Sequence, residues 1–284
     1  MKFFKELIIK KDWRLKQIFI VLLAVFCLGT SLRIGASFLK DRITKDGVLY
    51  VYMAEDVMND NNEHPPFSRN RRIPPLYTYL MALVSYLTGC SAETAGYAVS
   101  IAAGALLVFP VFMTASLLFS VRAGAVAAFL IAVNPYLIRI SSTIMRDSLF
   151  SFLLFCSIFF LVKALNTPRK PMFYWFAAGV FLSLSIACRN EAIELLGVLF
   201  VYTGAEYIFI RRRNPSLFPA GYYINMIIGI AVMFTAVYIT YLPLAASLQG
   251  TESDWSLIDR RIPGYFRTLL KISEKDALKS EDSI

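Results

Sequence analysis

The sequence predicts an all-α protein that crosses a membrane about seven times. Hydrophobic residues make up 57% of its 284 residues, against about 45–50% in typical globular proteins. Charged residues fall to 17%, where roughly 25% is usual. Long apolar runs recur along the chain, and about 20 such residues in a helix cross the hydrocarbon core of a bilayer. Because that core holds no water to bond free backbone groups, these runs are expected to be helices.

Eight apolar segments define the predicted elements. They lie near residues 17–38, 74–89, 95–119, 123–141, 147–165, 172–188, 191–210 and 219–247. All but one are long enough to span, and the spans are expected to be continuous helices. The exception is 74–89, which at 1.5 Å per residue reaches only about 24 Å of the roughly 30 Å required.

The first segment follows the basic stretch KKDWRLK, as the core of a signal peptide would. No small-x-small cleavage site follows it, whereas further spans do. We therefore interpret 17–38 as an uncleaved anchor.

Loop charges indicate how the chain runs through the membrane. If 74–89 does not cross, the basic N-terminal segment, Arg122 and the run 211–213 share one side, as is typical of cytoplasmic loops. If it crosses, the later charges move to the opposite side. We therefore predict an interfacial helix at 74–89, although the loop 39–73 is itself rich in lysine and arginine. The segment carries tyrosines suited to the membrane–water boundary: Tyr77, Tyr79 and Tyr86.

Three parts of the chain follow from this topology. They are a cytoplasmic N-terminal segment 1–16, a transmembrane domain 17–249 and a polar extracytoplasmic tail 250–284. The first outer loop, 39–90, holds the interfacial helices. We expect an integral protein of a bacterial inner membrane or plasma membrane, with its active site outside the cytoplasm.

Composition argues against several classes of protein. The four cysteines form no C-x-x-C pair, so we expect neither a disulfide framework nor a zinc site. The net charge of +9 fits cytoplasmic loops and contact with anionic lipids. The sequence has no basic stripe on a soluble domain, so we exclude nucleic acid as a partner.

The predicted topology gathers ionisable side chains on the outer face, where groups next to a bilayer are costly and often functional. Asp46, shortly after the first span, is either a solvated loop acid beside Lys45 or a general base at the membrane surface. Asp147 opens the fourth span. An acid in a first helical turn interacts favourably with the helix dipole, by roughly 0.3–1 kcal/mol. Asp147 can have this structural role and a catalytic role at the same time.

Two further groups of charges are candidates for a structural or a functional role. Arg189 stands at the turn before 191–210, where an ion pair with Glu191 or Glu194 would lower the cost of insertion. The arginines before the 74–89 helix either snorkel towards headgroups or bind a lipid phosphate, for which a planar guanidinium is well suited. These arginines are Arg69, Arg71 and Arg72.

Glu63 and His64 precede those arginines in the same loop. They are either ordinary loop residues or ligands of a divalent metal ion. Because such ions take more than two protein or water ligands, a metal remains only a possible cofactor of this site.

The order of four motifs resembles that of a known family. They are KDGVLYVYMAEDV, RRIPPLYTYLMALVSYLTG, NPYLIRISSTIMRDSLFSFLL and GVFLSLSIACRNEA. Over about residues 15–210 the chain resembles the GT-C membrane glycosyltransferases that use polyprenyl-phosphate sugars. Within them it is similar to the protein O-mannosyltransferase-like group, which includes the aminoarabinose transferases acting on lipid A.

The resemblance implies roles for particular residues. The key acid of the first outer loop maps to Asp46, although Gly47 stands where a second acid is usual. The acid that opens the fourth span maps to Asp147. The cation of the lipid-phosphate site maps to Arg72, with Arg71 beside it. The ligands of the divalent ion that some members hold would map to Glu63 and His64. Members of the family are usually longer than this chain.

These observations predict transfer of a sugar from a polyprenyl phosphate to a hydroxyl of a protein, lipid or glycan, with inversion. Asp46 would remove the proton, and Asp147 would orient the acceptor or help Asp46. Arg71, Arg72, Arg69 and Arg139 would stabilise the departing phosphate, with Arg189 and Glu191 in support.

Two other classes remain as alternatives. One is a truncated or non-catalytic membrane partner of another protein. The other is a transporter, which is less favoured because the ionisable groups gather at one face and not at the midplane.

Overall fold

The computed structural model describes residues 12–39, 43–59, 74, 76–166, 171–205 and 227–239. The chain divides into two units, Met1–Leu244 and Ala245–Ile284, and the described residues all belong to the first. The predicted tail 250–284 and the segment 1–11 lie outside the described residues.

The described part of the chain consists of helices and short turns and contains no strand, which confirms the all-α prediction. A further apolar helix follows the labelled ones at Ile227–Ile239. In chain order the labelled helices are α2 (Asp12–Phe38), α3 (Lys45–Asn59), α4 (Leu76–Thr88), α5 (Ala92–Leu106), α6 (Val108–Leu118), α7 (Val121–Val133), α8 (Pro135–Ser141), α9 (Asp147–Asn166), α10 (Pro171–Cys188), the 3-10 helix η2 (Asn190–Ile193) and α11 (Glu194–Ala205).

Three of the described helices are long and apolar enough to cross a membrane. They are α2 over Lys16–Phe38, α5 with α6 over Ala92–Leu118, and α9. The bent pair α7 and α8 adds a fourth if it counts as one span. Shorter apolar helices occupy Leu76–Thr88, Met172–Cys188 and Ile227–Ile239. The structure thus supports membrane insertion, while the total of seven spans remains a prediction.

The expectation of one continuous helix over 123–141 is wrong, because α7 and α8 meet at an angle of 56°. Asn134 causes the break together with Pro135. A residue before proline is pushed out of the helical region, and Asn134 is extended at φ −63° and ψ 119°. Its Oδ1 then accepts from the N–H of Leu137 at 3.1 Å, so it also caps the new helix.

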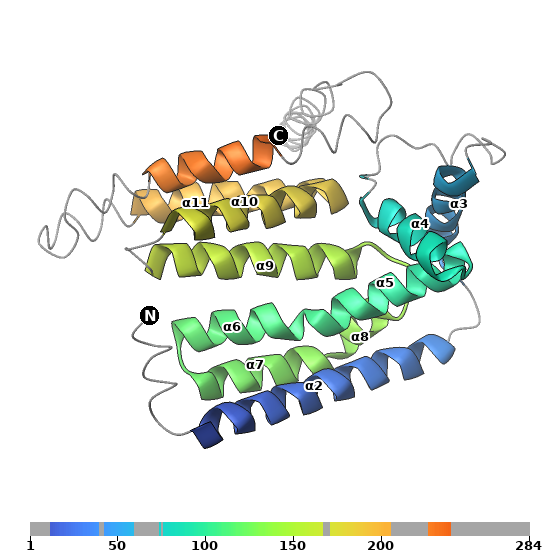
Figure 1. The fold of residues 1–284 in the computed structure, drawn as a ribbon, viewed down its shortest axis with the longest axis horizontal. Helices are drawn as coiled ribbons and strands as arrows, with labels where there is room; N and C mark the ends of the chain where they lie inside the picture. The colour runs from blue at the N-terminus through green and yellow to red at the C-terminus, as the bar shows by residue number, and fades with distance from the viewer. Residues whose placement is uncertain are drawn as a thin grey trace, which may run out of the picture. The chain divides into compact units, whose positions relative to one another are not determined.

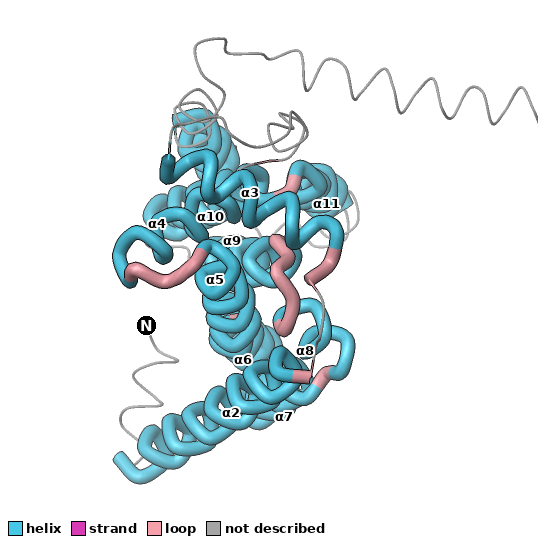
Figure 2. Tube along the Cα trace, turned by 90° about the vertical axis from the view of Figure 1, so that its right-hand side faces the viewer, coloured by secondary structure: helices cyan, strands magenta, loops and turns pink. Residues whose placement is uncertain are grey.

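The long helices run alongside one another, and α3 and α4 lie at one end of them (Figure 1). We call this the α3 end; α2 and α10 end there and α9 begins there. Figure 2 looks onto this end and shows α3 in front of α9 and α10. The predicted short helix 74–89 is present as α4, and its place at a membrane surface stays a prediction.

A buried cluster fastens α3 and α4 to the bundle. Each large apolar side chain buried in such a cluster contributes roughly 1.5–3 kcal/mol. Its members include Tyr50 of α3, Tyr77 and Met81 of α4, Val99 of α5, Leu149 of α9 and Cys188 of α10. Tyr77 was expected at the membrane–water boundary, but it is fully buried, whereas Tyr86 is 81% exposed.

Candidate functional site

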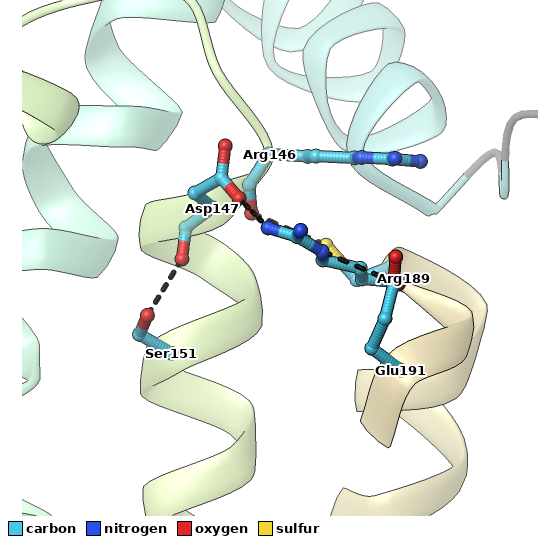
Figure 3. A network of polar contacts seen from close by, with 6 residues as sticks. Arg146, Asp147, Ser151, Arg189 and Glu191 are labelled. Atoms are coloured by element: carbon cyan, nitrogen blue, oxygen red, sulfur yellow. Dashed lines mark hydrogen bonds and ion pairs between the residues drawn. The ribbon is translucent and has the colours of Figure 1, made fainter. Parts of the chain in front are cut away.

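An ion pair joins the start of α9 to the end of α10 at the α3 end of the bundle (Figure 3). The Nη1 of Arg189 donates to Oδ1 of Asp147. The Nε of the same guanidinium lies 3.2 Å from Oε2 of Glu191, close enough for an ion pair although its N–H is not aligned for a hydrogen bond. Arg189 therefore bridges two carboxylates, one of which belongs to a predicted catalytic residue.

The electrostatics of this bridge favour its charged form. Partial burial opposes ionisation of Glu191, but its own backbone N–H and the cations Arg189 and Arg146 outweigh burial, so its pKa is lowered. Burial likewise acts against the Arg189 cation, and Asp147 and Glu191 reverse that effect and raise its pKa. The ion pair is thus stable at neutral pH.

Contacts at the Arg146 carbonyl and at the Phe150 ring connect the start of α9 to the end of α10. The thiol of Cys188 donates to the carbonyl of Arg146 at 3.4 Å, and the N–H of Phe150 donates to that carbonyl at 2.9 Å. The Arg189 guanidinium also lies 5.7 Å from the centre of the Phe150 ring. The motifs that contain MRDSLF and ACRNEA therefore form one connected structure.

Tyr77 of α4 ties the loop before α9 to the bundle. Its hydroxyl donates to the carbonyl of Gly96 at 3.0 Å and lies 2.7 Å from Oγ of Ser100. Ser100 in turn donates to the carbonyl of Met145 at 3.2 Å. Because Met145 stands two residues before Asp147, the buried tyrosine of the PPLY motif helps to fix the position of that acid.

Asp46 lies in the first turn of α3 and is exposed. One turn later, Tyr50 is buried with its ring against that of Tyr77, 5.3 Å between centres. Burial raises the pKa of Tyr50 to about 12; Asp46 and Asp147 act in the same direction and Arg146 opposes them.

Gly47, at the position where the family resemblance led us to expect a second acid, is closely packed. A Cβ at this buried position would lie 2.7 Å from Cγ2 of Ile43 and 3.3 Å from Cβ of Ile144. On the other side of the loop, a Cβ at Gly96 would lie 2.8 Å from Cγ2 of Ile144. Ile144 thus fits between two glycines, and an aspartate at 47 would displace the start of α3.

Arg146 is a candidate that the sequence interpretation missed. Its Nη1 is buried without a hydrogen-bond partner in the described part of the chain, and its side chain extends away from Asp147 (Figure 3). A buried polar atom without a hydrogen-bond partner is costly. Its position beside Asp147 in the sequence was the signal that could have identified it.

Arg139 lies in the last turn of α8, exposed, with its guanidinium 5.8 Å from the centre of the Tyr136 ring. The remaining predicted residues of the first loop lie outside the described residues; they are Glu63, His64, Arg69, Arg71 and Arg72. No three metal-binding side chains cluster within the described ranges. The metal ligands predicted at Glu63 and His64 therefore stay a prediction.

Comparisons with solved structures place this arrangement in a known fold. The chain is similar to the archaeal oligosaccharyltransferase AglB from Archaeoglobus fulgidus, solved with an inhibitory peptide and a dolichol-phosphate, with a TM-score of 0.67 and 17% identity over 82% of this chain. A second structure of the Archaeoglobus fulgidus oligosaccharyltransferase, tethered to an acceptor peptide, has a TM-score of 0.64 and 18% identity over 82% of this chain. In both cases the chain spans 30% of the matched structure.

The fold is that of the GT-C class of membrane glycosyltransferases. A family model described as dolichyl-phosphate-mannose-protein mannosyltransferase matches residues 72–239, more than half of the chain. The chain belongs to this family, as the four sequence motifs indicated. A comparison with curated protein sequences finds no match.

Proposed function

We propose that this protein transfers a sugar from a polyprenyl phosphate to an acceptor hydroxyl on the extracytoplasmic face, with inversion at the anomeric carbon. The observation that carries the proposal is the ion pair of Asp147 and Arg189 at the end of the bundle where α3, the helix that begins beside Asp46, also lies, in a chain of this family. The dolichol-phosphate in the similar AglB structure supports a lipid phosphate as donor.

The donor phosphate would bind among cations at this end. Arg69, Arg71 and Arg72 precede α4 in the sequence, and Arg139 ends α8. Arg146 joins them because a phosphate oxygen would give its buried Nη1 a partner. Fixed guanidinium groups would stabilise the negative charge that develops as the phosphate leaves.

Asp46 would act as the general base. Its exposed carboxylate takes the proton of the acceptor hydroxyl while the hydroxyl oxygen bonds to the anomeric carbon. The bond from that carbon to the phosphate oxygen breaks, and the phosphate leaves with the electron pair. Asp147, held in place by Arg189, would orient the acceptor.

The test is transfer of labelled mannose from mannosyl phosphoryl dolichol in vesicles that contain the purified protein. Asp46→Asn should abolish transfer and leave donor binding intact. Glu93→Gln is the matched control, because Glu93 is another exposed first-turn acid, at the start of α5. Equal transfer by Asp46→Asn and Glu93→Gln would remove the base assignment.

The same experiment separates the alternatives. Donor binding without transfer by the unaltered protein would favour a non-catalytic membrane partner. Loss of labelled sugar-lipid from one leaflet without any transferred product would favour a transporter.

A further inference from the structure

Arg33 lies in the last turns of α2 and is fully buried within the bundle. Its Nη1 donates to the carbonyls of Gly29 at 2.8 Å and of Ala132 at 3.1 Å. Its Nη2 donates to the carbonyl of Ile131 at 3.3 Å. A charge buried in an apolar helix therefore has two of its three partners on another helix, at the end of α7.

The break in the span explains why those two carbonyls need a donor. In a continuous helix the N–H of residue 135 would bond to the carbonyl of Ile131, but Pro135 has no N–H. In a continuous helix the carbonyl of Ala132 would accept from the N–H of residue 136, but here it accepts from Arg33. The end of a helix also carries partial negative charge, so a cation is favoured there.

Two glycines make room for the guanidinium. A Cβ at Gly29 would lie 3.0 Å from Nη1 of Arg33 and 3.2 Å from Cβ of Ala132. A Cβ at Gly104 of α5 would lie 3.0 Å from Nε of Arg33 and would collide with Oγ of Ser141. Helices α2, α5 and α7 therefore close around this one side chain.

Buried serines continue from this point to the start of α9. Ser141, the last residue of α8, donates to the carbonyl of Leu137 at 2.6 Å. Ser148 donates to Oγ of Ser141 at 3.2 Å, and both serines are buried. Ser148 directly follows Asp147, so this hydrogen bond links the end of α8 to the α9 terminus.

We propose that Arg33 is a positioning residue that holds the α7–α8 span bent, and thereby fixes the α9 terminus that presents Asp147. Its effect on sugar transfer rests on the proposed function; its effect on the bend does not. The carbonyls freed by the break are occupied by the guanidinium, so the break is closed by protein and is not left open to an ion.

A double-mutant cycle between Arg33 and Pro135 tests this role. Arg33→Met leaves the carbonyls of Ile131 and Ala132 without donors, whereas Pro135→Ala restores an N–H that can bond to Ile131. Pro135→Ala should therefore lower Tm in the unaltered protein, where it competes with Arg33, and raise Tm in Arg33→Met. Arg122→Met is the matched control, because Arg122 is an exposed arginine in the first turn of α7. Its Tm change should simply add to that of Pro135→Ala.

The second readout is alkylation of the buried Cys188, whose thiol reports whether Arg146 is in place. Peptide mapping should find Cys188 labelled severalfold faster in Arg33→Met and partly protected again in the double variant. If transfer activity is measurable, Arg33→Met should lower kcat and leave KM for the donor unchanged. Should Arg33→Met fail to fold, Arg33→Lys replaces it; because the ammonium keeps a donor but not the planar fork that bonds to both carbonyls, Pro135→Ala should lower Tm less in Arg33→Lys than in the unaltered protein.

Additive Tm changes for Arg33 and Pro135, as for the control pair, would overturn the proposal. Unchanged Cys188 labelling would overturn the link to the α9 terminus. Failure of sugar transfer in the unaltered protein would count against the proposed function alone, because both of the other readouts are independent of activity.

Discussion

Arg189 at the end of α10 and Asp147 at the start of α9 are separated by 42 residues and joined by an ion pair. Arg189→Gln removes the partner of Asp147 and also of Glu191. Because the pair is partly exposed, we expect a loss of about 1 kcal/mol in stability. The loss of transfer should be larger, up to about 100-fold, since misplacing a reacting group is costly. Activity equal to that of Arg122→Gln would contradict the positioning role of the pair.

Arg146→Gln should separate binding from stability. Removing the guanidinium relieves the cost of its unpaired buried Nη1, but it also removes a cation that favours the charged form of Glu191, so these opposing effects should leave Tm nearly unchanged. Affinity for a lipid phosphate should fall by roughly tenfold or more, corresponding to about 1.5–3 kcal/mol for a charged hydrogen bond. Binding is measured with dolichyl phosphate, and Arg122→Gln serves as control. A lower Tm with unchanged affinity would assign Arg146 a structural role.

Gly47→Asp should not restore activity although it recreates an acidic pair. The new Cβ meets Ile43 and Ile144, and overpacking of this kind costs about 1–3 kcal/mol. Gly35→Ala is the matched control, because nothing lies within 4 Å of a Cβ at Gly35. That control should be neutral or stabilising by about 0.4–1 kcal/mol. A Gly47→Asp variant as stable as Gly35→Ala would show that the contact with Ile144 is not tight.

Tyr77→Phe should lower stability by about 0.5–1.5 kcal/mol, since it removes the bond to Gly96 and the contact with Ser100. Because Ser100 holds Met145, sugar transfer should fall as well. Tyr86→Phe, at an exposed position of the same helix, is the control and should change neither quantity. Equal behaviour of the two variants would remove Tyr77 from the positioning network.

Stability should depend on the ionisation of Glu191 at acidic pH. Its pKa in the folded protein is below the ordinary value of 4.5. A carboxylate of this kind stabilises the fold fully above its ordinary pKa, and the contribution is lost as the pH falls below 4.5 and through the lowered pKa. The difference in Tm between the unaltered protein and Glu191→Gln should therefore shrink below pH 4.5. A difference that is constant with pH would contradict this assignment.

Sequence patterns predicted those features that depend on local composition. Long apolar runs predicted the helices, and the first-turn position of Asp147 follows from the sequence around it. The family resemblance, now confirmed by the family model, rested on the order of four motifs. The roles of Asp46 and of the arginines before α4 stay predictions.

Features that depend on contacts between helices were missed. Tyrosine is a residue type typical of the membrane–water boundary, but the burial of Tyr77 depends on its contacts with α3 and Gly96, which no local sequence pattern reveals. Arg33 could have been interpreted as a residue that reaches for headgroups near the end of a span, whereas its partners are carbonyls about a hundred residues away. The bend itself was predictable from Asn134 and Pro135, and hydropathy alone concealed it.

Ile144 between Gly47 and Gly96 has a consequence for engineering this family. A segment exchanged with a relative that carries an acid at position 47 would need a smaller residue at 144, and a smaller residue there would leave a void facing α5. Chimaeric enzymes should therefore inherit these three positions as a set, even though they come from three separate stretches of the gene.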